Sequence, residues 1–243
     1  MRKVSIVILI LLCVAFRADK VSILKPTASF PSPVHEPSDV CLSPSGATMY
    51  IVDDGGLLFE SDLSGQILRK APITKNYNDF EAVCTDGDRI CVSAESDRKI
   101  LVFDSKSLEL IHVVSYDFNS LRNSGFESLT FNPEKQCFYM VSEKNPIVIR
   151  QYAADFRLLD EKVFVGASDV SAASWHDHAL WLMSDEDRTL LKLDSSMEHI
   201  ASSWRLPVLN PEGFFFDTSN VLRVASDDME RIYLFNDPET HAR

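Results

Sequence analysis

Glycine is scarce in this sequence, with 8 glycines in 243 residues. A phosphate-binding loop needs several glycines close together, because its backbone must approach the phosphate closely. The chain has no such loop, and the GxSxG and HExxH motifs of hydrolases and metalloproteases are absent as well. The sequence therefore offers no familiar nucleotide-binding or nucleophile motif.

Basic residues are also in short supply, since 24 Lys and Arg stand against 36 Asp and Glu. Three of the basic residues, Arg2, Lys3 and Arg17, belong to the first 18 residues. The remainder therefore carries a net charge of about −15. Nucleic acids and anionic membrane surfaces require clustered Lys and Arg. We expect no nucleic-acid partner and a preference for cations.

Long hydrophobic runs are represented by a single segment, Val4 to Phe16, which follows the basic start of the chain. Thirteen residues are short for a membrane span and typical of the hydrophobic part of a signal peptide. We predict that residues 1–18 are a signal peptide, with an uncleaved membrane anchor through residues 4–16 as the alternative. The protein would then be exported, to the periplasm or the extracellular space, or remain anchored to the inner membrane.

Cysteine is infrequent too, with five in the chain and no CxxC or zinc-type spacing. Cys84 and Cys91 flank the turn at Asp86-Gly87 and could face each other across a hairpin. Either a disulfide or two buried thiols would fit that spacing.

Five similar segments fill the rest of the chain. Each reads as a short apolar strand, a turn, a second apolar strand, a polar turn and a third strand. In the first four, another extended run follows, so that units of four strands repeat every 41–48 residues. This period predicts an all-β, five-bladed β-propeller with very little helix over residues 19–243. The segments begin at Glu36, Asp79, Gly125, Asp169 and Asn210.

The fifth unit lacks its fourth strand, because the sequence ends at Arg243. The stretch from Val21 to Phe30 precedes the first unit and reads as one unmatched strand. We predict that this N-terminal strand completes the last blade, which would remove the open sheet edges of the ring.

Alignment of the five units reveals two columns of polar residues. The first column, at the start of the first strand, contains Ser38, Glu81, Glu127, Ser171 and Glu212. The second column, at the end of the second strand, contains Asp54, Glu95, Glu143, Asp185 and Asp227. The first two strands of a blade are antiparallel, so both columns lie at the same end of the sheet. Because the first strand is innermost in a propeller, we expect these side chains to converge on one mouth of the central channel.

So many carboxylates at one mouth repel one another unless a cation, shared protons or hydrogen-bond donors compensate them. Oxygen ligands without His or Cys favour Ca²⁺ or Mg²⁺, and a wide ring favours Ca²⁺. We predict a calcium site drawn from Glu81, Glu127, Glu212, Glu95, Glu143, Asp185 and Asp227. The alternative for the second column is structural: ion pairs with Arg98, Arg188 and Arg231, or hydrogen bonds that shape a corner common to all blades.

The repeats resemble those of the SdiA-regulated family of bacterial propellers, with a more distant similarity to NHL-repeat proteins and the esterase-like phytase domain. The resemblance lies in the strand starts DFEAV, GFESL and PEGFFFD and in the corners VSAESDRKI, MVSEKNP and MSDEDRTLLKLD. It implies a five-bladed propeller with bound calcium, and it implies no settled activity. Ser38 and Ser171 depart from the pattern, since they stand where the other units have Glu.

The sequence leaves two functions open. The first is a monomeric binding or scaffold module that holds Ca²⁺ and presents the channel mouth to an unknown small molecule or protein. The second is a metal-dependent hydrolase of phosphoesters, esters or lactones, in which a channel glutamate acts as the base.

Overall fold

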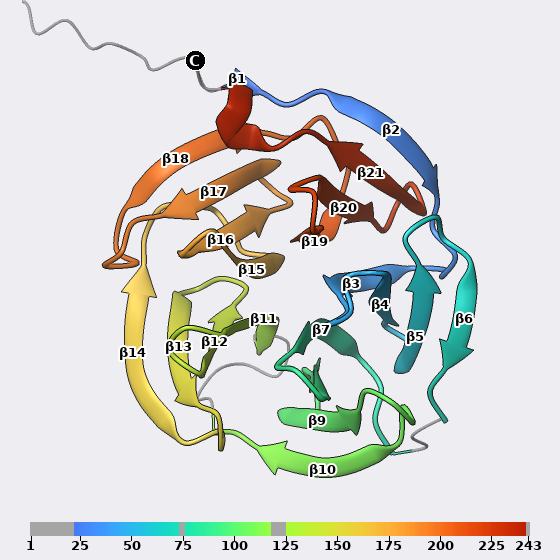
Figure 1. The fold of residues 1–243 in the computed structure, drawn as a ribbon. Helices are drawn as coiled ribbons and strands as arrows, with labels where there is room; N and C mark the ends of the chain where they lie inside the picture. The colour runs from blue at the N-terminus through green and yellow to red at the C-terminus, as the bar shows by residue number, and fades with distance from the viewer. Residues whose placement is uncertain (1–21, 73–75, 118–124, 242–243) are drawn as a thin grey trace, which may run out of the picture.

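The computed structural model describes residues 22–72, 76–117 and 125–241, and shows five blades around a central axis, four with four strands and one with five (Figure 1). The predicted fold is confirmed. The proposed signal peptide or anchor at residues 1–18 lies outside the described residues. Within the described ranges, no helix is long and apolar enough to cross a bilayer.

The innermost strand of each blade is the first in its unit, as the sequence predicted. Blade 1 contains β3 (Pro37–Leu42), β4 (Thr48–Asp53), β5 (Leu57–Asp62) and β6 (Ile67–Lys70). Blade 2 contains β7 (Phe80–Thr85), β8 (Arg89–Ala94), β9 (Lys99–Asp104) and β10 (Leu110–Ser115). Blade 3 contains β11 (Phe126–Asn132), β12 (Cys137–Ser142), β13 (Ile147–Ala153) and β14 (Leu158–Phe164).

The last two blades share the N-terminal segment. Blade 4 contains β15 (Ala172–His176), β16 (Ala179–Ser184), β17 (Thr189–Leu193) and β18 (Ile200–Arg205). Blade 5 contains β19 (Pro211–Phe216), β20 (Leu222–Ser226), β21 (Arg231–Phe235) and, as its outer strand, β2 (Pro26–Pro31). A 3₁₀ turn (Pro238–His241) follows β21.

Closure of the ring by the N-terminal strand is confirmed, because β2 pairs antiparallel with β21. The structure also contains a strand pairing that the sequence did not predict. The preceding residues form β1 (Ser22–Ile23), which pairs parallel with β18 as a fifth strand of blade 4. The segment therefore passes from the edge of one blade to the edge of the next, and it fastens the two blades together.

Apolar side chains form five core clusters, one between each pair of neighbouring blades. Strands buried on both faces explain the nearly continuous apolar runs in the sequence. The largest fully buried side chain is Trp181, which stacks on Trp204 with ring centroids 5.2 Å apart. These clusters fix the distances between blades, and therefore the distances between side chains that different blades bring to the channel.

Cys84 and Cys91 are direct cross-strand partners, and both are free buried thiols. Cys41 and Cys137 are free as well. Of the two possibilities that the spacing allowed, the structure has the unpaired thiols.

Candidate functional site: an acidic channel mouth

Four of the five first-column residues lie at β-bulges, the exception being Ser171, which precedes β15. In blade 2, Phe80 pairs with Ala94 and Ala82 with Ser93, so Glu81 is an extra residue without a partner on β8. The same register shift places Ser38, Glu127 and Glu212 at bulges of blades 1, 3 and 5. A bulge redirects the extra side chain and often lies beside a functional site. Strand periodicity did not predict these bulges.

The first-column glutamates influence one another across the channel. Burial is the main cause that raises the pKa of Glu81 to about 9 and that of Glu212 to about 8. The Glu127 pKa rises to about 10, first by burial and then by repulsion from Glu143, Glu95 and Glu81. Repulsion from Glu212 also raises the pKa of both Glu81 and Glu127. The three glutamates therefore share one low-dielectric region although they come from three blades.

The tightest group of carboxylates contains Asp79, Glu81 and Glu95. One oxygen from each lies within 4.8 Å of the other two. Glu81 and Glu95 were predicted, and Asp79 was not, because it precedes the strand and is absent from both columns. Asp79 has a left-handed backbone with φ of 62°, a conformation that Asp tolerates better than most residues. Its Oδ2 accepts hydrogen bonds from the backbone and hydroxyl of Ser96.

The predicted residues of the other blades lie outside this group of three. The Asp185 carboxyl adjoins that of buried Asp169, and this contact helps to raise the Asp169 pKa to about 7, after the larger effect of burial. Asp227 accepts a hydrogen bond from the amide of Asn210 at 3.4 Å. Glu143 forms an ion pair with Lys144. Of the predicted residues, Glu81 and Glu95 therefore belong to the compact group in blade 2. Asp185, Asp227 and Glu143 contact other side chains of their own blades instead.

Several second-column residues also connect one blade to the next. The backbone N–H of Gly125, in blade 3, donates to Glu95 Oε1 at 2.6 Å. The Val170 N–H donates to the Glu143 carbonyl at 2.9 Å, and the Asp79 N–H donates to the Asp54 carbonyl at 2.9 Å. Part of the regularity of this column is therefore structural, in line with the alternative raised from the sequence.

One further buried acid was missed by sequence reasoning. Asp39 is 3% exposed, and its two oxygens accept the N–H groups of Val40 at 2.7 Å and Val83 at 2.8 Å. Its pKa is raised, chiefly by burial. Asp39 follows Ser38 directly, so blade 1 brings a carboxyl to the inner ring although its first-column residue is a serine.

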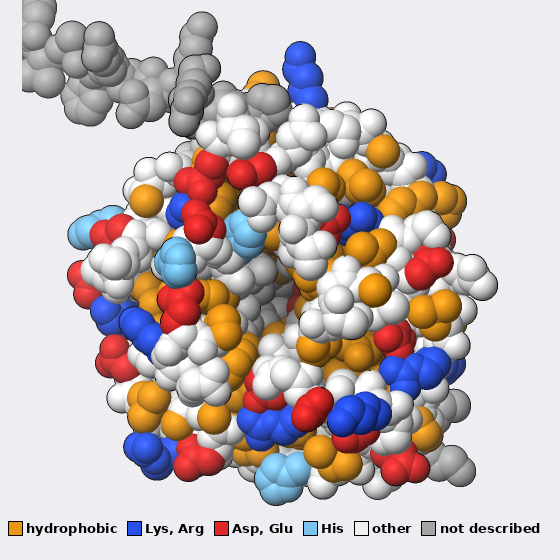
Figure 2. Space-filling view, in the orientation of Figure 1, with side chains coloured by type: hydrophobic (Ala, Val, Ile, Leu, Met, Phe, Trp, Pro, Cys, Tyr) orange, Lys and Arg blue, Asp and Glu red, His pale blue; other side chains and the backbone are white. Residues whose placement is uncertain are grey.

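The face of the molecule drawn in Figure 2 is hollowed at its centre. A family model described as SdiA-regulated matches residues 34–241 of this chain. The chain belongs to the SdiA-regulated family.

Solved structures with a similar fold are propellers of varied function. The glutaminyl cyclase of Myxococcus xanthus matches with a TM-score of 0.73 and 11% identity, over 89% of this chain and 97% of that one. The virginiamycin B lyase of Staphylococcus aureus matches with a TM-score of 0.53 and 14% identity, over 85% of this chain and 68% of that one. The Cps50 (Swd1) β-propeller domain of Myceliophteria thermophila matches with a TM-score of 0.54 and 7% identity, over 85% of this chain and 99% of that one. At these identities the likeness concerns the fold alone.

The acidic mouth of this SdiA-regulated propeller fits a hard cation. Calcium binds oxygen at 2.3–2.6 Å, so two ligand oxygens on opposite sides of one ion lie about 4.6–5.2 Å apart. The oxygens of Asp79, Glu81 and Glu95 are all within 4.8 Å of one another, so one ion could contact all three. A bound cation would also favour the ionised form of Glu81, which burial and neighbouring acids otherwise oppose.

Proposed function

We propose that this protein is a calcium-binding propeller that works as a binding or scaffold module, with the ion held at the acidic mouth. The observation that carries the proposal is the close approach of the Asp79, Glu81 and Glu95 oxygens beside a Glu81 whose pKa is raised to about 9. The other predicted residues remain proposed members of the calcium site, outside the compact group of three: Glu127, Glu212, Glu143, Asp185 and Asp227. Magnesium is the less favoured ion, because it prefers shorter bonds and retains its water.

The proposed role of the ion is to rigidify the channel mouth and to present a free coordination position there. The ligand would be a small molecule or a protein that offers an oxygen donor. Export through residues 1–18, to the periplasm or beyond, belongs to the same proposal, since extracytoplasmic calcium would keep the site loaded. The monomeric state also remains a prediction.

Thermal unfolding in calcium and in EDTA tests the proposal. An ion at 100 times its dissociation constant stabilises the folded state by about 2.7 kcal/mol. For a protein of this size, that corresponds to a rise in melting temperature of about 5–10 °C. Asp79→Asn should reduce the rise, whereas the exposed Asp97→Asn, in the same corner, should leave it unchanged. An equal melting temperature in calcium and in EDTA would refute the calcium site.

A catalytic role of the same mouth is the second candidate. It is favoured by the raised pKa of Glu212, about 8, since a carboxyl that holds its proton near neutral pH can act as a general acid. The similarity in fold to a glutaminyl cyclase, which is an enzyme, is compatible with a catalytic role. A bound cation would supply electrophilic polarisation of the substrate and a more acidic water.

Substrate panels test this second candidate. The panel would contain simple esters, lactones, phosphoesters and peptides with N-terminal glutamine, each assayed with calcium present. Turnover that is lost in Glu212→Gln and Glu127→Gln, with calcium binding retained, would support catalysis. Inactivity throughout the panel, together with a calcium-dependent melting temperature, would leave the binding module as the function.

A further inference from the structure

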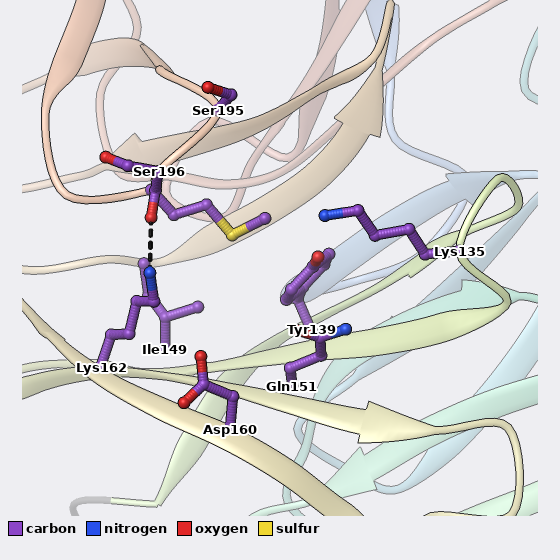
Figure 3. Close-up of a pocket in the computed structure, with 9 residues that line it drawn as sticks. Lys135, Tyr139, Ile149, Gln151, Asp160, Lys162, Ser195 and Ser196 are labelled. Carbon is purple, nitrogen blue, oxygen red and sulfur yellow. Dashed lines mark hydrogen bonds between the residues drawn. The ribbon is translucent and has the colours of Figure 1, made fainter.

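A polar pocket lies between blades 3 and 4, at the end of the blades opposite the acidic mouth. It has a volume of about 190 Å³ and is lined by β12, β13 and β14 and by the turn after β17 (Figure 3). Lys135 reaches it from the turn between β11 and β12. The turns that bound the pocket join the first strand to the second and the third strand to the fourth. Antiparallel topology puts those turns at the end of the blades opposite the acidic mouth.

One cross-strand row forms the base of this pocket. Tyr139 pairs with Gln151, and Gln151 pairs with Asp160, so the three side chains stand side by side on one face of blade 3. Ile149 and Lys162 form the next row. Met197 of blade 4 covers the space from the other side. The pocket therefore has a mainly polar lining, to which Ile149 and Met197 add an apolar part.

The Tyr139 hydroxyl is an unsatisfied buried group in this pocket. Tyr139 is 1% exposed, and its hydroxyl has no hydrogen-bond partner. The Asn132 and Cys137 side chains are polar neighbours of the hydroxyl, and the Asn132 amide nitrogen is also unpartnered. The Trp175 ring stacks on Tyr139 at 5.7 Å, and its indole N–H likewise lacks an acceptor. Buried polar groups without partners are costly and uncommon, so a cluster of such donors calls for an acceptor from outside the chain.

The pocket also carries one cation and one anion that are not paired with each other. Within the described residues, the side chains of Lys135 and Asp160 have no ion pair and no hydrogen bond. Lys162 is different, because its ammonium donates to the Ser196 carbonyl at 2.8 Å and lies 3.5 Å from Glu198. In Figure 3 the Lys135 ammonium and the Tyr139 hydroxyl point into one part of the opening, and the Asp160 carboxylate points in from the side of β14.

We propose that this pocket binds a small zwitterion, a free α-amino acid with an aliphatic side chain. Its carboxylate would accept from the Lys135 ammonium and the Tyr139 hydroxyl, and its ammonium would bind Asp160. Its side chain would pack on Ile149 and Met197. A simple anion fits less well, because it would leave Asp160 unpaired beside it. The volume suits this size class, since drug-sized ligands require about 300–1,000 Å³.

Calorimetric titration of the full-length protein with L-leucine, in the presence of calcium, tests the proposal. We expect saturable binding that weakens about tenfold or more in Lys135→Met, in Asp160→Asn and in Tyr139→Phe, because each loses a charged or hydrogen-bonded contact. The matched control is Lys106→Met, a well-exposed lysine in the turn between β9 and β10, at the same end of blade 2, which should bind as the wild type does.

Three chemical variants of the probe separate a zwitterion site from other sites. N-acetyl-L-leucine lacks the ammonium, L-leucinamide lacks the carboxylate, and inorganic phosphate is a simple anion. We expect each to bind about tenfold or more weakly than L-leucine. Absence of L-leucine binding, equal binding in the pocket variants, or phosphate binding as tight as that of L-leucine would each overturn the proposal. None of these outcomes depends on the calcium site.

Discussion

Glu81→Gln should be less stable than the wild type in calcium and more stable than the wild type when calcium is removed. The Glu81 pKa rises from 4.5 to about 9, mainly through burial and then through repulsion from Asp54, Asp79 and Glu95. Without a cation, the folded protein therefore keeps a proton on Glu81 at neutral pH, whereas the unfolded chain has released it. The contribution of Glu81 to stability is complete below pH 4.5 and is lost as the pH rises toward 9.

The magnitude follows from that pKa interval. In the unfolded chain the Glu81 carboxyl has a pKa of 4.5, about 2.5 units below pH 7. At about 1.4 kcal/mol per unit, keeping the proton on the folded protein at pH 7 costs at most about 3 kcal/mol of folding free energy. Glutamine has the same shape and no proton to hold, so Glu81→Gln avoids this cost. Incomplete hydrogen bonding of the new amide would offset about 1–2 kcal/mol of the gain. At pH 5 the difference should shrink below about 1 kcal/mol.

Urea unfolding at pH 7 and pH 5, each in EDTA and in calcium, measures the effect. In EDTA at pH 7, Glu81→Gln should be the more stable protein. In calcium the wild type should be more stable, because it retains the full set of carboxylate ligands. The exposed Glu109→Gln serves as the control and should match the wild type in all four conditions. A Glu81→Gln protein that is less stable than the wild type in EDTA at pH 7 would refute the electrostatic reasoning.

Three further changes test the fold. Gly213→Ala would place a methyl group 2.6 Å from the Val40 backbone nitrogen, so we expect a loss of about 1–3 kcal/mol in urea unfolding, and unchanged stability would contradict this contact between blades. Trp181→Ala should cost about 3–5 kcal/mol in the same assay, because the indole is fully buried between blades 4 and 5, and a loss below about 1 kcal/mol would contradict that packing. Deletion of residues 1–31 removes β2 and leaves β21 as an open edge, so size-exclusion chromatography should show self-association, and a stable monomer would argue against closure by this strand.

The number of blades, the order of strands and the closing strand could all be predicted from the sequence. Each depends on local patterns, namely apolar runs, turn residues and their period, and every blade repeats them. The pairing of β1 with β18 could not be predicted in this way, because two residues carry no pattern and their partner lies far along the chain.

The candidate site could be predicted in part. The positions of Glu81 and Glu95 in their columns placed both residues at one end of blade 2, and the structure brings their oxygens within 4.8 Å of each other. Asp79 escaped prediction because its contribution depends on a left-handed backbone just before the strand, and Asp39 because only its position between blades shows that it is buried.

The sequence by itself determined which residues lie at which end of each blade, since antiparallel pairing converts spacing along the chain into a place on the sheet. Only the tertiary structure decided how far apart carboxyls of different blades lie, which of them are buried, and that Tyr139 and Asp160 stand in one row beneath blade 4. Those distances are set by packing between blades, where side chains from remote segments interlock, and no local pattern encodes them.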